Sequence, residues 1–455
     1  TACTPPATTT TTTTAVAATA TTPTTPTIPT ITIAYTDQHN TRNLQTEAWP
    51  ARAPTTTPAA SFCRQNNFQA ATPSKASICR ARTLILDSLE DLLDPTQDVP
   101  SSTPTASPTS DPEVTAVLTR SNLFGIAVRL AFHDAGEADL SAEGSGDRMG
   151  PDGCLSNTPG NGGLVEAESL VVRKIEPLWQ QVCGGISRAD FWALFASIVV
   201  ETAASEPTSI NFSYGRRDAV ECEAGGGRLP GGEEDLEEVL AIFEGKLGLS
   251  MRETVVLLGA HSLGHVHPDT SGYGFDPDTV TSEPGEEADL EFYINAWDDT
   301  PDVLDNEFFI TLTKQTRKAQ RVPPNPNPPN RVITQWQRET LPFLMLNTDM
   351  ALAFPVAPTP PPADSETQTC SPPLGVDPDQ DSPYGCINPA STTPPSTLDI
   401  ALDFADNNLR FLTSFAKAFT KLTQEGYRVS GGQGEQWHRR LQGGRNGGNG
   451  NGGNG

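Results

Sequence analysis

The chain has 455 residues, and 36% of them are hydrophobic, below the roughly 45–50% of an ordinary globular domain. Its 38 Gly and 41 Pro are clustered, so part of the chain cannot build a core. Acidic residues outnumber basic ones by 56 to 30, and this excludes the basic face that a nucleic-acid partner needs. No apolar run approaches the ~20 residues of a membrane span.

Residues 1–62 are rich in Thr and Pro and have no hydrophobic periodicity. Such a tract is either a mucin-like O-glycosylated segment or a plain disordered linker, and we favour the first. The sequence starts at Thr1, which we interpret as a mature N-terminus left by signal-peptide removal or as the result of trimming. One N-glycosylation sequon occurs, at Asn211. Together these features predict a secreted, extracellular glycoprotein.

Apolar periodicity predicts a mainly α-helical domain over residues 63–428, without convincing strands. Pro-rich loops interrupt it at 95–112 and 355–397, and a Gly/Asn-rich tail follows at 429–455. The predicted helices cover 80–94, 114–135, 164–175, a segment from about Ser187 through ADFWALFASIVVETAA, 233–246, 250–262, 304–319, 331–349 and 398–425.

The chain has eight cysteines with long spacings and no CxxC pair. They are Cys3, Cys63, Cys79, Cys154, Cys183, Cys222, Cys370 and Cys386. The pattern favours four disulfides formed in an oxidising compartment over a zinc site or eight buried thiols. The pair Cys370–Cys386 would close one Pro-rich loop, and the other pairings remain open.

Two of the six histidines lie in apolar helices, His133 in VRLAFHDAG and His261 in VVLLGAHSLG. A lone histidine in such a helix is usually a hydrogen-bonded core residue. However, Arg129 precedes His133 by four residues and shares its helix face. A buried arginine beside a neutral histidine is costly unless an anionic ligand or a developing negative charge faces it. Asp134 and Asp152 could hold a hard cation nearby.

Two motifs carry a family resemblance: RLAFHDA at 129–135 and LLGAHSLGHVHP at 257–268, about 130 residues apart. Further matches are MGPDGC, NGGL, SRADF, YGRRDA, RLPGG, WDDTPDVLDNEFF, MLNTDMALA and LTSFAKAFTKL. Over about residues 75–427 the chain resembles the plant-type haem peroxidase superfamily. The resemblance implies an all-α, two-lobed helical fold with few or no strands, and a haem b between a distal and a proximal helix.

On the proximal side, the resemblance implies that His261 binds the haem iron through Nε2 and that Asp349 accepts a hydrogen bond from its other ring nitrogen. Trp297 would stack under the haem. The secreted fungal branch usually has Phe there, whereas cytochrome c and ascorbate peroxidases have Trp. This residue would either hold a radical cation or simply pack, and both interpretations stay open.

On the distal side, the resemblance implies that His133 is the acid–base catalyst and that Asn161 orients it. Arg129 would stabilise the charge on the departing oxygen, and Phe132 would pack against the haem face, as in the secreted branch. Val256 stands where lignin-type enzymes carry a surface radical Trp. His267 stands where a manganese site would need an acid, so neither activity is assigned.

The resemblance also implies two calcium sites. The distal set is Asp134, Gly150 and Asp152, but Cys154 replaces the usual Ser, so this site is either rebuilt or weak. The proximal set matches without a gap and comprises Ser262, Asp298, Thr300, the Val303 carbonyl and Asp305. The alternative is that these acids are merely solvated.

The resemblance implies a structural buried salt bridge between the GRRDA segment (Arg216, Arg217, Asp218) and Asp190. The predicted function is an extracellular haem peroxidase that reduces hydrogen peroxide and oxidises small electron donors by one-electron steps. The alternative is a structural glycoprotein of an extracellular matrix or filament, assembled through the low-complexity tails. We expect no nucleic-acid partner. The reducing substrate is not identified.

Overall fold

The computed structural model describes residues 73–94, 112–141, 150–156, 159–219, 222, 229–274, 294–314, 317–322, 333–338, 343–354, 356, 369–370 and 396–424. The predicted Thr/Pro segment, the 429–455 tail, nearly all of the two Pro-rich stretches and the proposed partner Cys386 lie outside these residues. All described residues belong to one compact unit that spans Ala59–Gly455.

The described residues are mainly helical, as predicted. The α-helices are α2 (Lys75–Leu92), α3 (Pro112–Gly136), α4 (Glu176–Trp179), α5 (Arg188–Ala203), α6 (Leu236–Leu240), α7 (Met251–Leu258), α8 (Pro268–Ser271), α10 (Glu307–Lys314), α11 (Asn347–Met350), α12 (Thr397–Ala405) and α13 (Asn408–Leu422). Short 3₁₀ turns are η1 (Pro159–Asn161) and η4 (Gly259–Ser262), and π turns are η2 (Val171–Ile175) and η3 (Ala241–Lys246).

Side-chain caps explain several helix starts. Ser187 accepts from the Asp190 N–H at the start of α5, and Ser250 forms a capping box with Glu253 at the start of α7. The single helix predicted over 398–425 is two helices, because Asn407 adopts an extended conformation after α12. Its side chain accepts from the Arg410 N–H at 2.8 Å and starts α13.

The helix predicted over 331–349 is wrong. This region contains β2 (Ile333–Arg338), β3 (Leu344–Leu346) and only then the single turn α11. Strands β1 (Arg317–Val322) and β4 (Thr369–Cys370) complete an antiparallel sheet of order β3-β2-β1-β4. The segment carries β-branched and aromatic residues that favour strands, and Pro342 disfavours a continuous helix. The helix predicted over 304–319 likewise ends at Lys314.

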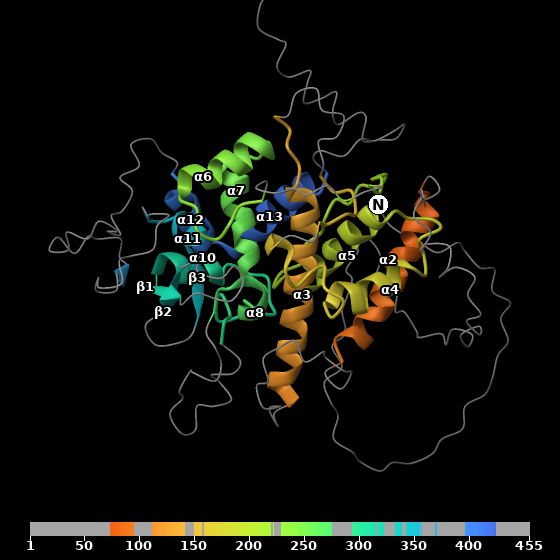
Figure 1. Ribbon diagram of the computed structural model, residues 1–455, viewed down its shortest axis with the longest axis horizontal. Helices are drawn as coiled ribbons and strands as arrows, with labels where there is room; N and C mark the ends of the chain where they lie inside the picture. Colours follow the sequence, from red (N-terminus) through yellow and green to blue (C-terminus); the bar gives the residue numbers. More distant parts are fainter. Residues whose placement is uncertain are drawn as a thin grey trace, which may run out of the picture. The chain divides into compact units, whose positions relative to one another are not determined.

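The long helix α3 lies between two groups of elements in Figure 1. On one side it packs on α5, which in turn packs on α2. Nearly every residue of α5 is buried, so its apolar composition reflects a central position. On the other side, α7 packs on α12 and α13, and α10 packs on α12. Within the described residues, no helix combines the length and the apolar character that crossing a membrane requires.

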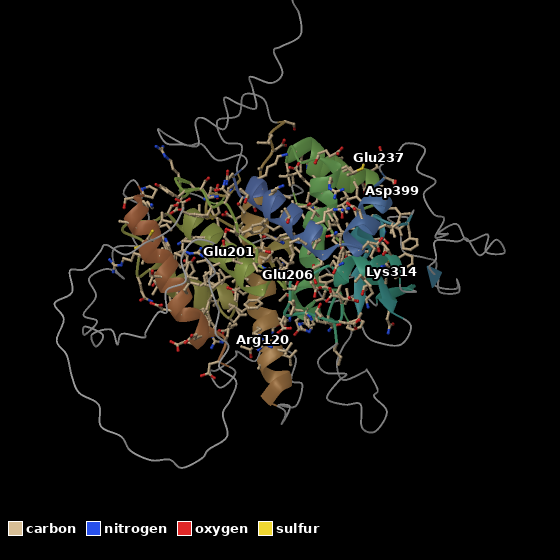
Figure 2. The ribbon with its side chains drawn as sticks, turned by 180° about the vertical axis from the view of Figure 1, so that it is seen from behind. Arg120, Glu201, Glu206, Glu237, Lys314 and Asp399 are labelled. Carbon is tan, nitrogen blue, oxygen red and sulfur yellow. A yellow bond between two sulfur atoms is a disulfide. The ribbon has the colours of Figure 1, made fainter. Side chains whose placement is uncertain are left out.

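The N-terminal half of α3 is tied to the chain that follows His261. Gly125 and Gly264 approach so closely that a Cβ built on Gly125 would lie 2.9 Å from the Gly264 Cα. Arg120, at this end of α3 (Figure 2), pairs with Asp302 at 2.7 Å. Because these contacts leave no room to slide, they set the position of the two histidine-bearing elements relative to each other.

The predicted buried ion pair is confirmed. Arg216 Nη1 lies 2.8 Å from Asp190 Oδ1, and both side chains are fully buried. Arg216 also donates to the carbonyl of Thr423, which anchors the end of α13. Asp218 instead accepts the N–H groups of Arg188 and Ala189 at the start of α5, so its role is also structural.

Candidate active site

One face of α3 carries Arg129, Phe132 and His133 at helical spacing, and all three side chains keep some exposed surface. Their neighbours Val128, Leu130 and Ala131 are buried. These three residues therefore form a partly exposed stripe on an otherwise largely buried part of α3. Phe132 stacks on Phe243 with ring centroids 6.0 Å apart, which fixes the position of the Phe132 ring.

The hydrogen bonds of His133 determine which of its nitrogens carries the proton. His133 Nδ1 lies 2.8 Å from Asn161 Oδ1, which can only accept, so Nδ1–H donates and Nε2 keeps its lone pair. The Asn161 amide cannot flip, because its Nδ2 donates to the Ser156 carbonyl at 2.9 Å. The pair places an unprotonated Nε2 on the partly exposed face.

Although Arg129 and His133 keep some accessible surface, most of each side chain is removed from bulk water, and this sets the protonation states on this face. Burial, and then the positive charge of Arg129, lower the pKa of His133 to about 3. Burial lowers the pKa of Arg129 to about 10, although Glu166 opposes this. Near neutral pH the face therefore presents a neutral imidazole base beside a permanent cation.

The guanidinium of Arg129 is held by backbone carbonyls. Its Nη1 donates to Gly162 O at 2.7 Å and its Nη2 to Gly160 O at 3.1 Å. Each terminal nitrogen has a second N–H, so the group can still donate to an anion. Gly163, with a φ of 81°, lets the backbone pass close to it: a Cβ there would lie 3.5 Å from Arg129 Nη1.

The second histidine of the predicted site, His261, lies on the turn η4 at the end of α7. Its Nδ1 lies 2.8 Å from Asp349 Oδ1, and the Asp349 side chain is fully buried while that of His261 is 34% exposed. The other carboxylate oxygen of Asp349 accepts the Leu346 N–H at 2.8 Å. Since the carboxylate accepts from Nδ1–H, Nε2 of His261 is the nitrogen available to a ligand.

Trp297 stacks on the His261 ring. The ring centroids lie 4.1 Å apart and the planes differ by 3°. Trp297 itself is buried with Val266 and Leu344, and Tyr273 and Leu346 pack against this small cluster. The predicted site residues thus form two groups. One lies around α3 and contains Arg129, Phe132, His133 and Asn161. The other lies around η4 and contains His261, Trp297 and Asp349.

These groups fit a haem. The proximal group offers a histidine nitrogen whose ring is oriented by a buried carboxylate, which is the ligand type and outer support that haem iron requires. The distal group offers a base and a cation on a face that retains exposed surface within an apolar helix.

Comparison with known proteins identifies the family of this chain. Residues 109–355, more than half of the chain, match the family described as Peroxidase. The chain belongs to the peroxidase family. It is a haem-dependent peroxidase of the plant-type superfamily, an oxidoreductase that acts on hydrogen peroxide.

Individual relatives agree with this. The chain is 28% identical to the cytosolic L-ascorbate peroxidase 2 of Oryza sativa subsp. japonica over 213 residues, 46% of this chain and 72% of the relative. It is 30% identical to the mitochondrial cytochrome c peroxidase of Aspergillus fumigatus over 233 residues, 50% of this chain and 53% of the relative. It is 29% identical to L-ascorbate peroxidase 3 of Arabidopsis thaliana over 209 residues, 44% of this chain and 61% of the relative.

The oxygens of the residues predicted to form the proximal calcium site lie together in this peroxidase. Ser262 Oγ lies 2.7 Å from Asp298 Oδ2, 3.3 Å from the Val303 carbonyl and 3.5 Å from Asp305 Oδ1. Thr300 Oγ1 lies 3.2 Å from Asp305 Oδ1. Burial is the main cause that raises the pKa of Asp298 well above its usual value and also raises that of Asp305. A bound cation would offset this cost.

The distal set is arranged differently. Asp134 is buried and accepts backbone N–H groups of the segment that contains Asp152, while Gly150 is buried with a φ of 117°. Cys154 forms a disulfide with Cys222, so its sulfur is not available as a ligand. Among the described residues, no group of three or more His, Cys, Asp or Glu side chains is arranged to hold a metal.

The remaining predicted positions are consistent with their surroundings. Asn211 is exposed, as a glycosylation site must be, and Val256 is buried in α7. Sequence reasoning missed the carbonyl of Ser156, because every residue has one, and it left the partner of Cys222 open, because eight cysteines allow many pairings. The glycine pair Gly125–Gly264 could have been suspected from glycines inside apolar segments.

Proposed function

We propose that His133, Arg129 and Asn161 form the peroxide-cleaving group and that His261, Asp349 and Trp297 form the haem-binding group. The observation that carries the proposal is that both histidines are tied through Nδ1 to a fixed acceptor, one an amide and one a carboxylate. Each ring therefore keeps Nε2 for chemistry, one as a base and one as a ligand.

When bound, haem b supplies the iron centre that receives the peroxide and passes its oxidising equivalents to a donor. His133 Nε2 accepts a proton from one peroxide oxygen and delivers it to the other, which leaves as water. Asn161 keeps the proton on Nδ1 throughout. Arg129 donates to the leaving oxygen while negative charge builds on it, and Phe132 keeps water from that side of the haem.

On the proximal side, His261 would bind the iron through Nε2, and Asp349 would hold the proton of Nδ1. A hydrogen bond to a carboxylate makes the imidazole a stronger electron donor. The proximal oxygen set would hold one calcium ion next to Ser262, the residue that follows His261. This ion would fix the turn η4, since the set also includes the Val303 carbonyl and two carboxylates.

The test is the rate of the peroxide reaction in stopped-flow experiments. We expect His133→Leu to slow this step by about 10²–10⁴-fold while haem stays bound, because only the proton transfer is lost. Asn161→Ala should slow it less. His265→Leu is the matched control, since it removes a second partly exposed histidine, whose Nδ1 lies 3.1 Å from Ser121 Oγ, and it should leave the peroxide step unchanged. An unchanged rate in His133→Leu would contradict the assignment.

We also propose an extracellular location. In support, Cys79, Cys154, Cys183 and Cys222 are all disulfide-bonded, which is typical of oxidising compartments, and the sequon at Asn211 is exposed. The cytosolic and mitochondrial locations are those of the relatives named above, and we do not assign them to this chain. Mass spectrometry of the native protein tests the proposal: an N-glycan on Asn211 supports it, and an unmodified Asn211 with reduced cysteines contradicts it.

The alternative role in a matrix or filament, through self-assembly, depends on the tails outside the described residues. Light scattering at high concentration decides between assembly and a monomer.

A further inference from the structure

Hydrogen bonds hold residues 150–156 against α3, next to His133. Asp134, the next residue in α3, accepts at Oδ1 the N–H groups of Asp152 at 3.2 Å, Gly153 at 2.9 Å and Cys154 at 3.4 Å. One carboxylate oxygen thus gathers three successive backbone donors. The segment cannot move away from α3 without leaving this buried carboxylate unsatisfied.

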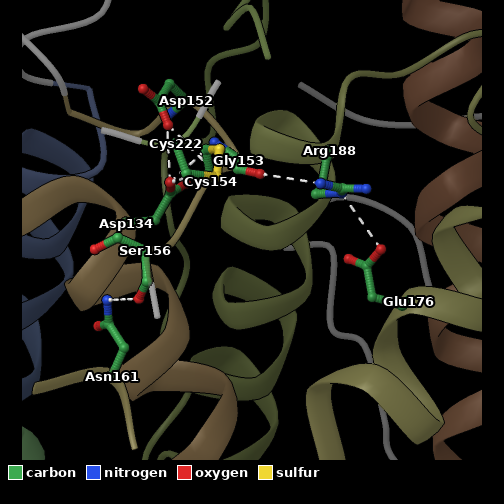
Figure 3. The surroundings of a disulfide bond; sticks show 9 residues. All are labelled: Asp134, Asp152, Gly153, Cys154, Ser156, Asn161, Glu176, Arg188 and Cys222. Atoms are coloured by element: carbon green, nitrogen blue, oxygen red, sulfur yellow. Dashed lines mark hydrogen bonds and ion pairs between the residues drawn. A yellow bond between two sulfur atoms is a disulfide. The ribbon is translucent and has the colours of Figure 1, made fainter. Parts of the chain in front are cut away.

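A covalent bond holds the same segment from the other side. Cys154 is joined to Cys222, 68 residues later, as Figure 3 shows. The carbonyl of Asp152 accepts the Ala219 N–H at 2.9 Å, so the chain near Cys222 also contacts the segment through its backbone. A Cβ on Gly153 would lie 2.7 Å from the Ala189 nitrogen, which shows how closely the segment sits on α5.

Two hydrogen bonds connect residues 150–156 to His133. Ser156 lies two residues after Cys154, and its carbonyl accepts from Asn161 Nδ2 at 2.9 Å (Figure 3). Asn161 Oδ1 in turn accepts from His133 Nδ1 at 2.8 Å. The orientation of the imidazole therefore depends on where the Ser156 carbonyl stands, and the disulfide constrains that position from two residues away.

A calcium ion at the distal set does not fit this arrangement. The family resemblance implies a serine hydroxyl at position 154, and here the sulfur is bonded to Cys222. Asp134 Oδ1 is engaged by three N–H groups, and Asp152 Oδ1 accepts the Cys154 N–H at 3.1 Å. The disulfide therefore removes the side-chain ligand at position 154, and backbone N–H groups engage one oxygen of each carboxylate.

We propose that the Cys154–Cys222 disulfide is a positioning element of the distal site: it takes the structural place of the distal calcium ion and, through Ser156 and Asn161, holds His133 in its working orientation. The inference rests on the proposed role of His133. Neither cysteine touches the reacting atoms, so both are positioning residues.

The test uses two double variants of the full chain. C154A/C222A removes the disulfide without replacement, and we expect the peroxide step to slow by roughly 10–100-fold, as loss of an outer-shell support does. C154S/C222S also removes it but restores the serine hydroxyl that the resemblance implies. Its peroxide step should become calcium-dependent and recover when calcium is added, whereas that of C154A/C222A should not.

A readout independent of activity is amide hydrogen exchange in the haem-free protein. Residues 150–163 should exchange faster in C154A/C222A than in the unaltered chain. The control C79A/C183A removes two other disulfide-bonded cysteines and should leave both this exchange and the peroxide step unchanged. Unaltered exchange and rate in C154A/C222A would overturn the proposal.

The calcium content of the unaltered chain is a second test, and it does not depend on whether the cysteine variants fold. The unaltered chain should bind no more than one calcium ion, measured by atomic emission, and Asp298→Asn should bind none. Two ions in the unaltered chain, or one retained in Asp298→Asn, would place calcium at the distal set and overturn it. If His133→Leu leaves the peroxide step unchanged, the proposed function fails. If His133→Leu slows this step but C154A/C222A leaves it unchanged, only the role of the disulfide fails.

Discussion

The imidazole of His261 and the indole of Trp297 stack in parallel, with centroids 4.1 Å apart, while Asp349 holds the imidazole from its edge at 2.8 Å. Ring face and ring edge are therefore fixed by two different residues. A metal ligand so constrained offers Nε2 in one direction only, which is what tight binding of a flat cofactor requires.

Replacing His261 tests this ligand directly. His261→Ala removes the nitrogen that would bind iron, and we expect the purified variant to lose haem or retain it weakly, seen as a reduced Soret band per protein. His265→Ala is the matched control four residues later and should keep the band. Full haem retention with unchanged turnover in His261→Ala would refute the assignment.

Trp297→Phe separates packing from redox chemistry. Phenylalanine preserves an aromatic stack on His261, so haem binding and the peroxide step should change little. Electron paramagnetic resonance after peroxide addition should show a tryptophan radical in the unaltered chain and none at this position in the variant. An identical radical spectrum in both proteins means that Trp297 only packs.

The pH dependence follows from the distal histidine. Burial and Arg129 lower the pKa of His133 to about 3 from an ordinary value of 6.5, so its base form persists well below neutral pH. The peroxide step should stay constant from pH 7 to about pH 5 and decline only toward about pH 3. A midpoint near 6.5 in the rate profile would show that His133 is not the base or is not buried.

The same shift affects stability. Between about pH 6.5 and about pH 3 the unfolded chain binds a proton on His133 that the folded chain does not, so the free energy of unfolding falls as the pH is lowered through this range. His133→Leu should remove this part of the pH dependence, measured by denaturant unfolding. An unchanged pH profile of stability would contradict the burial argument.

Calcium at the proximal set should stabilise the fold. At about 100 times its dissociation constant, one ion adds about 2.7 kcal/mol to the free energy of unfolding. The gain should grow as the pH rises, because calcium competes with protons on Asp298 and Asp305, whose pKa values are raised. Asp298→Asn should lose the calcium-dependent rise in Tm, and the exposed Asp269→Asn should keep it.

The helical part of the fold could be predicted because its signals are local. The start of α5 follows from Ser187 as an N-cap before an apolar run, and α3 from continuous apolar periodicity around His133. The strands β1 to β4 could not: β3 and β4 have three and two residues, the mainly polar β1 and β2 show no alternating apolar pattern, and all four are held by pairing with one another. Their stability comes from those contacts, which local periodicity does not report.

Candidate site residues could be proposed from the sequence where a side-chain type carries the chemistry. The structure joins His133 to Asn161 and His261 to Asp349, and it adds which nitrogen of each imidazole is protonated. The Ser156 carbonyl was not predictable, because every residue has a carbonyl. The pairing of Cys154 with Cys222 could not be deduced either, since eight cysteines allow many connectivities.

We propose that this chain holds a haem on His261 and cleaves peroxide with His133. The most direct measurement is the optical spectrum of the purified protein before and after one equivalent of hydrogen peroxide. We expect a Soret band that shifts on peroxide addition and returns when a phenolic donor is supplied. A protein without a Soret band after haem reconstitution, or with a band that peroxide leaves unchanged, would contradict it.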